Sequence, residues 1–345
     1  MKAHVLITNK DTFPVCRDKL FWGIGIPGCP SVFEEWTNPA NSRKSYLKML
    51  VDMIGIVVGD LIFLYERKVG FHGLYKVNSP LFFDTTNVLD ASGLSVGSQW
   101  PLRITLECMF YFPQAVPEDL LFSTPHYENI FWVWAYRKSQ GPRGCNTITP
   151  EAAEALIELL VKVNGEHVEN DRFDPYAPSE INTVPFPVHA RNGKVALEDL
   201  LRGYILKQLG NGNLLENIFG PIEDVEWYAN NVPYHITQKN IDILIFHKKT
   251  KYTVNPLRYK YSIVELKKDK AVPRDVSQLI RYSQWTSGRL ANGEVEMIQP
   301  VLIAHDFSSQ AIKKARNEDF NNKDIMLIKY EAIDDDNICF DVLAL

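Results

Sequence analysis

The sequence has little cysteine, and its five cysteines are scattered without a CxxC or Cys/His spacing. The common zinc-site signatures and a disulfide framework are therefore excluded, and we expect a reducing, cytoplasmic environment. Long hydrophobic runs are also lacking. The most apolar stretch, 49–65, is broken by Asp52, Asp60 and two glycines, so it cannot span a bilayer. The first residues lack the apolar run of a signal peptide, and no membrane partner is expected.

Internal repeats and low-complexity tracts are absent as well, which excludes a solenoid or a propeller. A chain of 345 residues exceeds one ordinary hydrophobic core, so two domains are predicted. The segment 166–190 holds four prolines and no periodicity, which is typical of an extended linker. We therefore expect a first domain at 1–165 and a second at 191–345.

The first domain has mostly the pattern of β-strands, closed by one helix. Short apolar segments predict a strand at 3–8, three strands within 54–77 that a Gly-Asp turn and a charged turn with Gly70 separate, and extended segments at 79–86 and 100–112. The Gly- and Pro-rich segment 21–45 predicts a loop, and 131–138 predicts another extended segment with Trp132 and Trp134 on one face. A helix is predicted from Pro150, with Thr149 as its N-cap.

The second domain alternates between segments with the hydrophobic spacing of helices and segments with the pattern of strands. Helical spacing is found at 195–209, 273–285 and 308–320, with a turn and a short helix within 210–219. Strand patterns are found at 225–230, 241–248, 261–268, 297–307 and 324–333. An antiparallel start followed by strand, helix, strand, helix and strand predicts an α/β fold with a mixed sheet flanked by helices.

Two acids and a lysine carry the candidate chemistry. Asp242 opens one apolar run, and in the next run Glu265 and Lys267 share one strand face. Two carboxylates can hold a divalent ion and a lysine can sit beside the attacking water, which is what metal-dependent phosphodiester cleavage needs. The alternative is an exposed, charged strand face of no catalytic importance.

Further polar side chains fall around this set. Gln278 and Tyr282 stand four residues apart on the predicted helix that follows, and therefore on one helix face. Glu198, at the border of the apolar stripe of helix 195–209, can add a third carboxylate. Glu216 competes for that role, and Glu198 is preferred for its place on the longer amphipathic helix.

Charge is unevenly distributed along the chain. The net charge is −5, yet residues 241–290 carry 11 Lys and Arg against 4 Asp and Glu. Contact with a DNA or RNA backbone and a solvated sheet edge both fit this segment. In the first domain, a Gly-rich loop carries Arg137, Lys138 and Arg143, for which a phosphate contact and an ordinary solvated turn both stay open.

Aromatic side chains of the first domain are expected mostly in its core. Trp22 stands between Phe21 and Gly23 in the predicted loop, so it is the better candidate for a pocket in which a flat ring stacks against a flipped base. Tyr65 and Trp100 are further candidates for the walls of that pocket.

The motifs that carry the candidate site residues also follow one another in the order that is typical of a known protein superfamily. They are ALEDLL with Glu198, IDIL with Asp242, VELKK with Glu265 and Lys267, and QLIRY with Gln278 and Tyr282. In this order the C-terminal domain resembles the PD-(D/E)XK nuclease superfamily, and more closely its mismatch-endonuclease branch (NucS/EndoMS), over about 191–310. The insertion 248–260 lengthens the hairpin between the acids beyond that pattern, as a DNA-contacting finger or an inert loop.

The resemblance implies a role for each residue of the set. Asp242, Glu265 and the backbone carbonyl of Leu266 would bind Mg²⁺, with Mn²⁺ as a substitute. Lys267 would orient the attacking water and help to deprotonate it, and Glu198 would bind a second ion or its water shell. By the same resemblance, Gln278 would position a phosphate or a metal-bound water, and Tyr282 would support the site.

The first domain carries a second resemblance. GDLIFLY (59–65), GFHGLYKV (70–77) and WPLRITLE (100–107) resemble the PUA-like superfamily, in particular its EVE/YTH-type members. This resemblance implies a small β-barrel that reads a modified or extruded base in a pocket.

Together these features predict a Mg²⁺-dependent endonuclease acting on double-stranded DNA, with the first domain reading a modified base as in modification-dependent restriction. A homodimer is expected, because a duplex has two strands to cut. The alternative is a mismatch- or structure-specific repair endonuclease. A third class is a nucleic-acid-binding protein without catalysis.

Overall fold

A computed structural model describes most of the chain as two compact units. The described residues are 2–26, 28–40, 44–89, 95–96, 100–136, 143–169, 173–181, 183–212, 215–234, 239–249, 251, 257–317 and 324–343. The first unit comprises Met1–Thr37 with Arg43–Pro185, and the second comprises Asn38–Ser42 with Phe186–Leu345. None of the helices in these ranges is long and apolar enough to cross a membrane.

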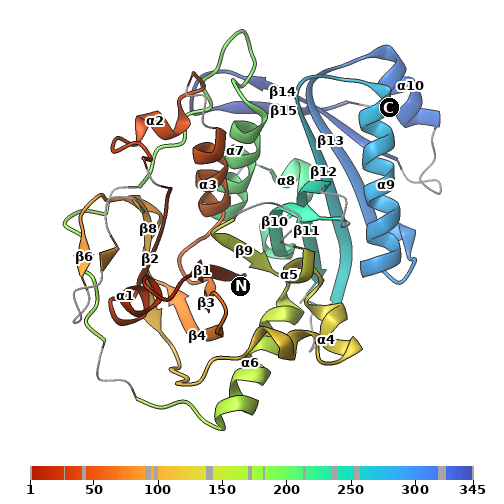
Figure 1. Cartoon of the computed structure of the whole chain (residues 1–345). Coiled ribbons are helices and arrows are strands. Elements are labelled where there is room, and N and C mark those ends of the chain that lie inside the picture. The colour runs from red at the N-terminus through yellow and green to blue at the C-terminus, as the bar shows by residue number, and fades with distance from the viewer. Residues whose placement is uncertain are drawn as a thin grey trace. The chain divides into compact units, whose positions relative to one another are not determined.

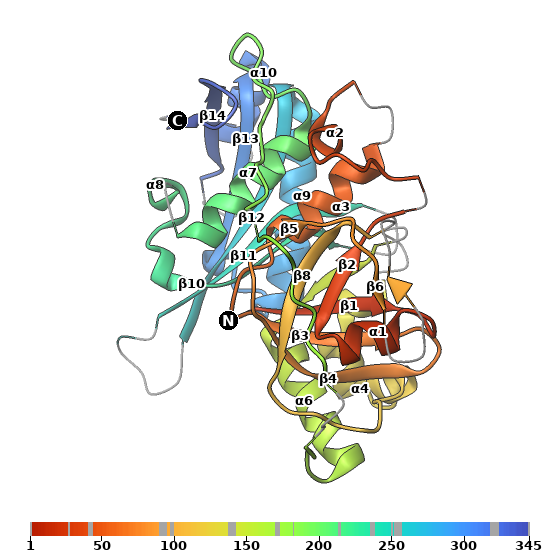
Figure 2. The same cartoon turned by 90° about the vertical axis from the view of Figure 1, so that its left-hand side faces the viewer.

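The first unit is built on one curled sheet (Figure 2). Its strand order is β2-β8-β4-β3-β1-β9, and β5 also pairs with β8. Only β1 and β3 pair in parallel among the described strands of this sheet. The strands are β1 (Ala3–Thr8), β2 (Phe21–Ile24), β3 (Leu61–Glu66), β4 (Gly70–Val77), β5 (Phe82–Phe83), β8 (Leu102–Cys108) and β9 (Cys145–Ile148), and a separate pair is β6 (Val88–Leu89) with β7 (Ser95–Val96).

Helices surround this sheet. They are α1 (Phe13–Asp18), α2 (Glu34–Thr37), α3 (Lys44–Ile54), the 3-10 helix η1 (Glu118–Phe122), α4 (Pro125–Ile130), α5 (Trp132–Tyr136) and α6 (Pro150–Asn164). As predicted, α6 begins at Pro150, and the Thr149 hydroxyl accepts a hydrogen bond from the Ala152 N–H at 3.3 Å. Leu156, Leu159 and Leu160 of α6 pack into the core with side chains of β1, β3 and β4.

Three predictions for the first unit are wrong. The segment 131–138 is helical where it is described, because Thr124 caps a helix that starts at Pro125 and the next helix, α5, follows directly. A short apolar run does not distinguish helix from strand, and the upstream cap was the stronger signal. The predicted loop 21–45 contains β2, all of α2 and the start of α3. Of the three strands expected within 54–77, the first is not formed, because α3 extends to Ile54 and residues 55–60 are turn and loop, whereas the other two are β3 and β4.

Gly23 explains why the loop prediction failed. It lies inside β2, where a Cβ atom would stand 2.8 Å from the carbonyl oxygen of Trp100. The glycine therefore permits close packing of β2 against the backbone that precedes β8. It does not mark a turn.

The second unit is a mixed sheet with helices, as predicted, and six strands of it are described. Its order is β10-β11-β12-β13-β14-β15, in which β12, β13 and β14 are parallel and the other pairs antiparallel. The strands are β10 (Val225–Pro233), β11 (Asn240–Lys249), β12 (Leu257–Ala271), β13 (Ile298–Phe307), β14 (Met326–Ala332) and β15 (Ile338–Val342), the last of which the sequence pattern missed.

The helices of this unit either precede the first strand of the sheet or connect its parallel strands. They are α7 (Glu198–Asn211), α8 (Glu216–Phe219), η3 (Ile222–Asp224), α9 (Pro273–Leu290), η4 (Val295–Met297) and α10 (Ser309–Asn317). Helix α9 lies along β12 and β13, with α10 beside it (Figure 1). Pro273 opens α9, and the carboxylate of Asp275 accepts a hydrogen bond from the Val272 N–H at 2.8 Å, which fixes where the helix begins.

Two helical glycines of the second unit test how closely α7 packs against its neighbours. A Cβ atom on Gly203 in α7 would overlap the buried ring of Phe186, whereas a Cβ atom on Gly288 in α9 would meet nothing within 4 Å. Gly203→Ala is therefore expected to destabilise the second unit by about 1–3 kcal/mol through overpacking. Gly288→Ala, the matched control, is expected to stabilise it by about 0.5–1 kcal/mol.

The measurement is urea unfolding of the full chain, with hydrogen exchange of α7 to locate the effect in the second unit. Equal stabilities of the two variants would contradict the packing of Phe186 on α7.

Candidate functional site

Two buried carboxylates lie opposite each other on neighbouring strands of the second unit. Ile243 of β11 pairs with Val264 of β12, so the antiparallel register sets Asp242 beside Glu265. Asp242 is 8% exposed and Glu265 is 1% exposed. A solvated strand face is thereby excluded for these acids, and their burial needs compensating partners.

The two oxygens of Glu265 differ in their surroundings. Oε1 accepts hydrogen bonds from Lys267 Nζ at 2.5 Å and from Gln278 Nε2 at 2.7 Å. Oε2 is buried and has no hydrogen-bond partner. Burial, followed by the negative charge of Asp242, raises the pKa of Glu265 to about 8. One oxygen of this carboxylate is thus free to accept a cation or a proton.

Lys267 is held at this carboxylate. Its Nζ also donates to the carbonyl oxygen of Leu266 at 2.9 Å, and the side chain is 23% exposed. Burial disfavours the ammonium, but Glu265 and Asp242 outweigh that effect and raise the pKa of Lys267. The lysine is therefore protonated at neutral pH and bridges buried carboxylate and solvent.

Helix α9 brings the two predicted polar residues to the same place. Gln278 donates through Nε2 to Glu265 and also to the Tyr282 hydroxyl at 3.0 Å, one helical turn further on. Tyr282 is buried, and its ring packs against Tyr234 with the centroids 5.0 Å apart. Burial raises the pKa of the Tyr282 phenol, so it stays a neutral hydrogen-bonding group.

Helix α7 contributes Glu198 and a residue that the sequence reasoning missed. Arg202, one turn after Glu198, donates through Nη2 to Asp242 Oδ1 at 2.6 Å and through Nη1 to Asp199. The second oxygen of Asp242, Oδ2, accepts the Leu266 N–H at 2.8 Å. An arginine inside the apolar stripe of an amphipathic helix, four residues after a candidate acid, was the signal that could have found it.

Of the two competing acids, Glu198 belongs to the cluster. Burial and the charge of Asp242 raise the pKa of Glu198, and the charge of Glu198 in turn acts on Glu265. Glu216 lies in α8, where its carboxylate accepts the Ile222 N–H at 3.4 Å. The structure thus couples Glu198 to Asp242 and Glu265.

The basic segment is largely paired where it is described. Lys249 pairs with Asp224, and Arg258 donates to Glu226 at 2.7 Å, with Lys248 3.9 Å from the same glutamate. These acids precede the counted window, so part of its positive charge is neutralised within the unit. Residues 250 and 252–256 of the insertion lie outside the described residues.

The donor set fits a single hard cation. The described residues hold no group of three His, Cys, Asp or Glu side chains at metal-binding spacing. Mg²⁺ does not require one, because it keeps several waters and binds through one or two carboxylates. The unpartnered Oε2 of Glu265 beside the Asp242 carboxylate is such a place, with the Leu266 carbonyl next to it.

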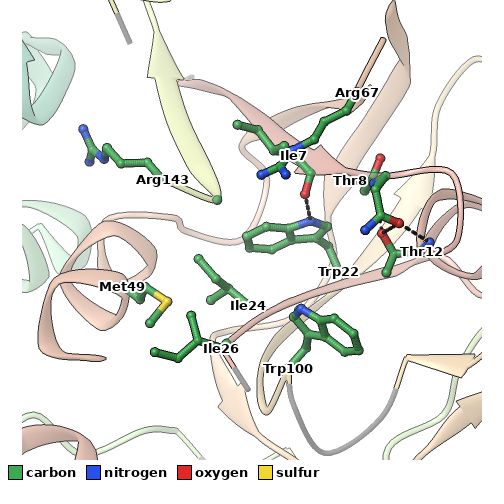
Figure 3. A pocket seen from close by; sticks show the side chains of 14 residues that line it. Ile7, Thr8, Thr12, Trp22, Ile24, Ile26, Met49, Arg67, Trp100 and Arg143 are labelled. Atoms are coloured by element: carbon green, nitrogen blue, oxygen red, sulfur yellow. Dashed lines mark hydrogen bonds between the residues drawn. The ribbon is translucent and has the colours of Figure 1, made fainter. Parts of the chain in front are cut away.

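The first unit has a cavity of about 270 Å³ between β1, β2 and the segment before β9. Trp22 and Trp100 both line it (Figure 3). The Trp22 indole N–H donates to the Ile7 carbonyl at 3.3 Å, which fixes the ring, and Trp100 is only partly buried. Two of the three aromatic candidates therefore meet at one pocket.

Two arginines line this pocket in different ways. Arg67 is exposed. Arg143 donates through Nε to the buried carboxylate of Asp52 at 2.8 Å, and its guanidinium points away from Trp22 (Figure 3). Arg143 is therefore an internal ion-pair partner instead of a solvated turn residue. The predicted loop residues Arg137 and Lys138 lie outside the described residues.

Tyr65 does not line the pocket. Its hydroxyl donates to Glu118 Oε2 at 2.7 Å, and its ring packs against Phe71 and Trp134 in the core of the first unit. Tyr65 lies on β3, and the side-chain alternation of that strand directs it toward the core. Trp22, expected in a loop, lies on β2.

Comparisons with known proteins give no family. No family model matches the chain, and no curated protein matches it. The N-terminal half is similar to solved structures of a Pseudomonas putida protein (14% identity, 46% of this chain and 99% of that chain, TM-score 0.29) and of an Agrobacterium tumefaciens protein (14%, 51% and 100%, 0.26). It is also similar to human THYN1 in complex with 5-methylcytosine containing DNA (9%, 46% and 98%, 0.26).

Tyr65→Phe tests whether Tyr65 belongs to the core of the first unit instead of the pocket. Loss of the hydroxyl removes one donor from the Glu118 carboxylate, which the Trp134 indole N–H also contacts at 3.0 Å. We expect a loss of about 1–3 kcal/mol in unfolding free energy and unchanged DNA binding. Urea unfolding and fluorescence polarisation with a labelled duplex measure the two quantities. Weaker DNA binding at unchanged stability would contradict the core position and indicate that Tyr65 contributes to the pocket.

Proposed function

We propose that the protein is a Mg²⁺-dependent DNA endonuclease in which the first unit reads a base and the second cuts the backbone. One observation carries the proposal: the buried Glu265 carboxylate has an unpartnered oxygen and shares its position with Asp242, Lys267 and Gln278. A stability-driven fold has no need to bury two facing carboxylates, because apolar residues of similar volume serve as well or better.

The residues of the cluster have separable tasks in this proposal. Asp242, Glu265 and the Leu266 carbonyl would hold the ion, which supplies charge stabilisation and lowers the pKa of a bound water. Lys267, anchored between Glu265 and the Leu266 carbonyl, places an ammonium beside the phosphate and offsets its developing negative charge.

Gln278 and Tyr282 act on the geometry of the site. The Gln278 amide joins Glu265 to the Tyr282 hydroxyl, so α9 fixes the rotamer of the carboxylate. A carboxylate with one oxygen fixed presents its other oxygen in a constant direction, which is the preorganisation that a metal site requires.

For the first unit, the proposal rests on its pocket and on the sequence resemblance to EVE/YTH-type domains. Two indoles, one fixed by a hydrogen bond and one partly exposed, can stack an extruded base between apolar walls. We propose a modified cytosine or adenine as this base. Cutting both strands of a duplex would require two copies of the second unit, and hence a homodimer.

Variants of the cluster test the chemistry. Glu265→Gln and Lys267→Met are expected to lower Mg²⁺-dependent cleavage of a plasmid at least about 100-fold, since one removes a ligand charge and the other a transition-state contact. Lys270→Met is the matched control: it removes a lysine of the same strand that pairs with the half-exposed Asp306 at 3.0 Å. We expect the control to cut at the parent rate.

Circular dichroism checks that the three variants fold alike. If Glu265→Gln and Lys267→Met both cut as fast as the Lys270 control, the assignment of the active site is wrong.

A substrate panel tests the base reader. Duplexes with methylated or hydroxymethylated cytosine, methylated adenine, unmodified bases and mismatches are compared at equal enzyme concentration. We expect preference for one modified duplex, and a loss of that preference by roughly 5- to 100-fold in Trp100→Ala, since base–aromatic stacking contributes about 1–3 kcal/mol. Trp100→Phe, which keeps a stacking ring, is the matched control and should retain most of the preference.

The panel also separates the alternatives. Equal cleavage of modified and plain duplexes would overturn the base-reading role. Preference for mismatched duplexes would favour a repair endonuclease, and binding without cleavage in Mg²⁺ or Mn²⁺ would favour a non-catalytic protein.

A further inference from the structure

Arg202 is a cation built into the centre of the acidic cluster. Its side chain is 7% exposed, and its guanidinium contacts Asp199, Asp242 at 2.6 Å, and Glu198 at 3.9 Å. An arginine so buried is costly unless its charge is matched, and here three carboxylates surround it.

The position of Arg202 bears on the number of ions. A second ion bound through Glu198 would have to share Asp242 or lie next to it, and the guanidinium already occupies the contact between these two carboxylates. Glu265 is different, because its buried Oε2 accepts no hydrogen bond.

The formal charges agree with this geometry. In their ionised forms, in which they would hold a cation, Glu198, Asp199, Asp242 and Glu265 carry four negative charges, whereas Arg202 and Lys267 carry two positive ones. One divalent cation balances the remainder. Two divalent cations would leave a buried excess of positive charge, which is unfavourable before a phosphate arrives.

We propose that Arg202 takes the place of a second metal ion, so that the cluster binds one divalent cation, between Asp242 and Glu265. The inference rests on the proposed function and deepens it. Glu198 then acts as a partner of Arg202, which replaces the expectation that it binds a second ion.

A purely structural role for Arg202 makes a different prediction. An arginine that only anchors α7 to β11 would, when removed, lower stability and leave the number of bound ions unchanged. An arginine that substitutes for an ion leaves three carboxylates without a cation when it is removed, and their negative charge then attracts a second divalent ion.

The test is the number of Mn²⁺ ions bound per full-length chain, without DNA, measured by titration with electron paramagnetic resonance of the free ion. We expect one ion for the parent, one for Arg202→Lys and two for Arg202→Met. Glu198→Gln is expected to keep one ion with affinity within about threefold of the parent, because Glu198 is not a ligand, whereas Glu265→Gln is expected to lose the ion.

Each outcome decides a separate point. Two ions on the parent would overturn the inference and leave the nuclease proposal standing, and so would a loss of the ion in Glu198→Gln. One ion on Arg202→Met that is folded by circular dichroism would overturn the role of Arg202. If Arg202→Met does not fold, the parent, Arg202→Lys and Glu198→Gln still decide between one ion and two. No binding to the parent at millimolar Mn²⁺ would overturn the inference and the proposed function together.

Discussion

The burial of two facing carboxylates, Asp242 and Glu265, is the constraint on which the second unit depends. Each would carry a large desolvation cost in a dry interior, and their mutual repulsion adds to it. The surroundings offset this cost with Arg202 and Lys267 and with the Leu266 N–H. The two acids can therefore be buried together only when α7, β11 and β12 are packed against one another.

The topology of the sheet also explains how Gln278 of α9 comes to contact the Glu265 carboxylate. Strand β12 leaves the sheet into α9, which returns along β12 and β13, so the first turns of α9 come close to the end of the strand that carries Glu265. Gln278 then reaches the carboxylate at 2.7 Å. A connecting helix thereby fixes the orientation of a carboxylate that a strand carries.

The limits of the sequence are clearest in the first unit. Helix α6 was predictable from Thr149 and Pro150, because capping is a local interaction. The segment 131–138 was predicted as a strand and is helical where it is described, since a short apolar run is compatible with a strand and with a helix. Tyr65 was assigned to a pocket and lies in the core, because whether a strand residue faces inward depends on what covers that face.

For the candidate site, the sequence by itself determined the acids, the lysine and the two polar residues of α9, because strand alternation and helical spacing place them on known faces. Only the tertiary structure decided which partners those groups meet. Arg202 lies 40 positions before Asp242 and pairs with it, and Glu265 keeps one oxygen without a donor. Such contacts join residues far apart in the chain, and their free energy depends on burial that no local pattern encodes.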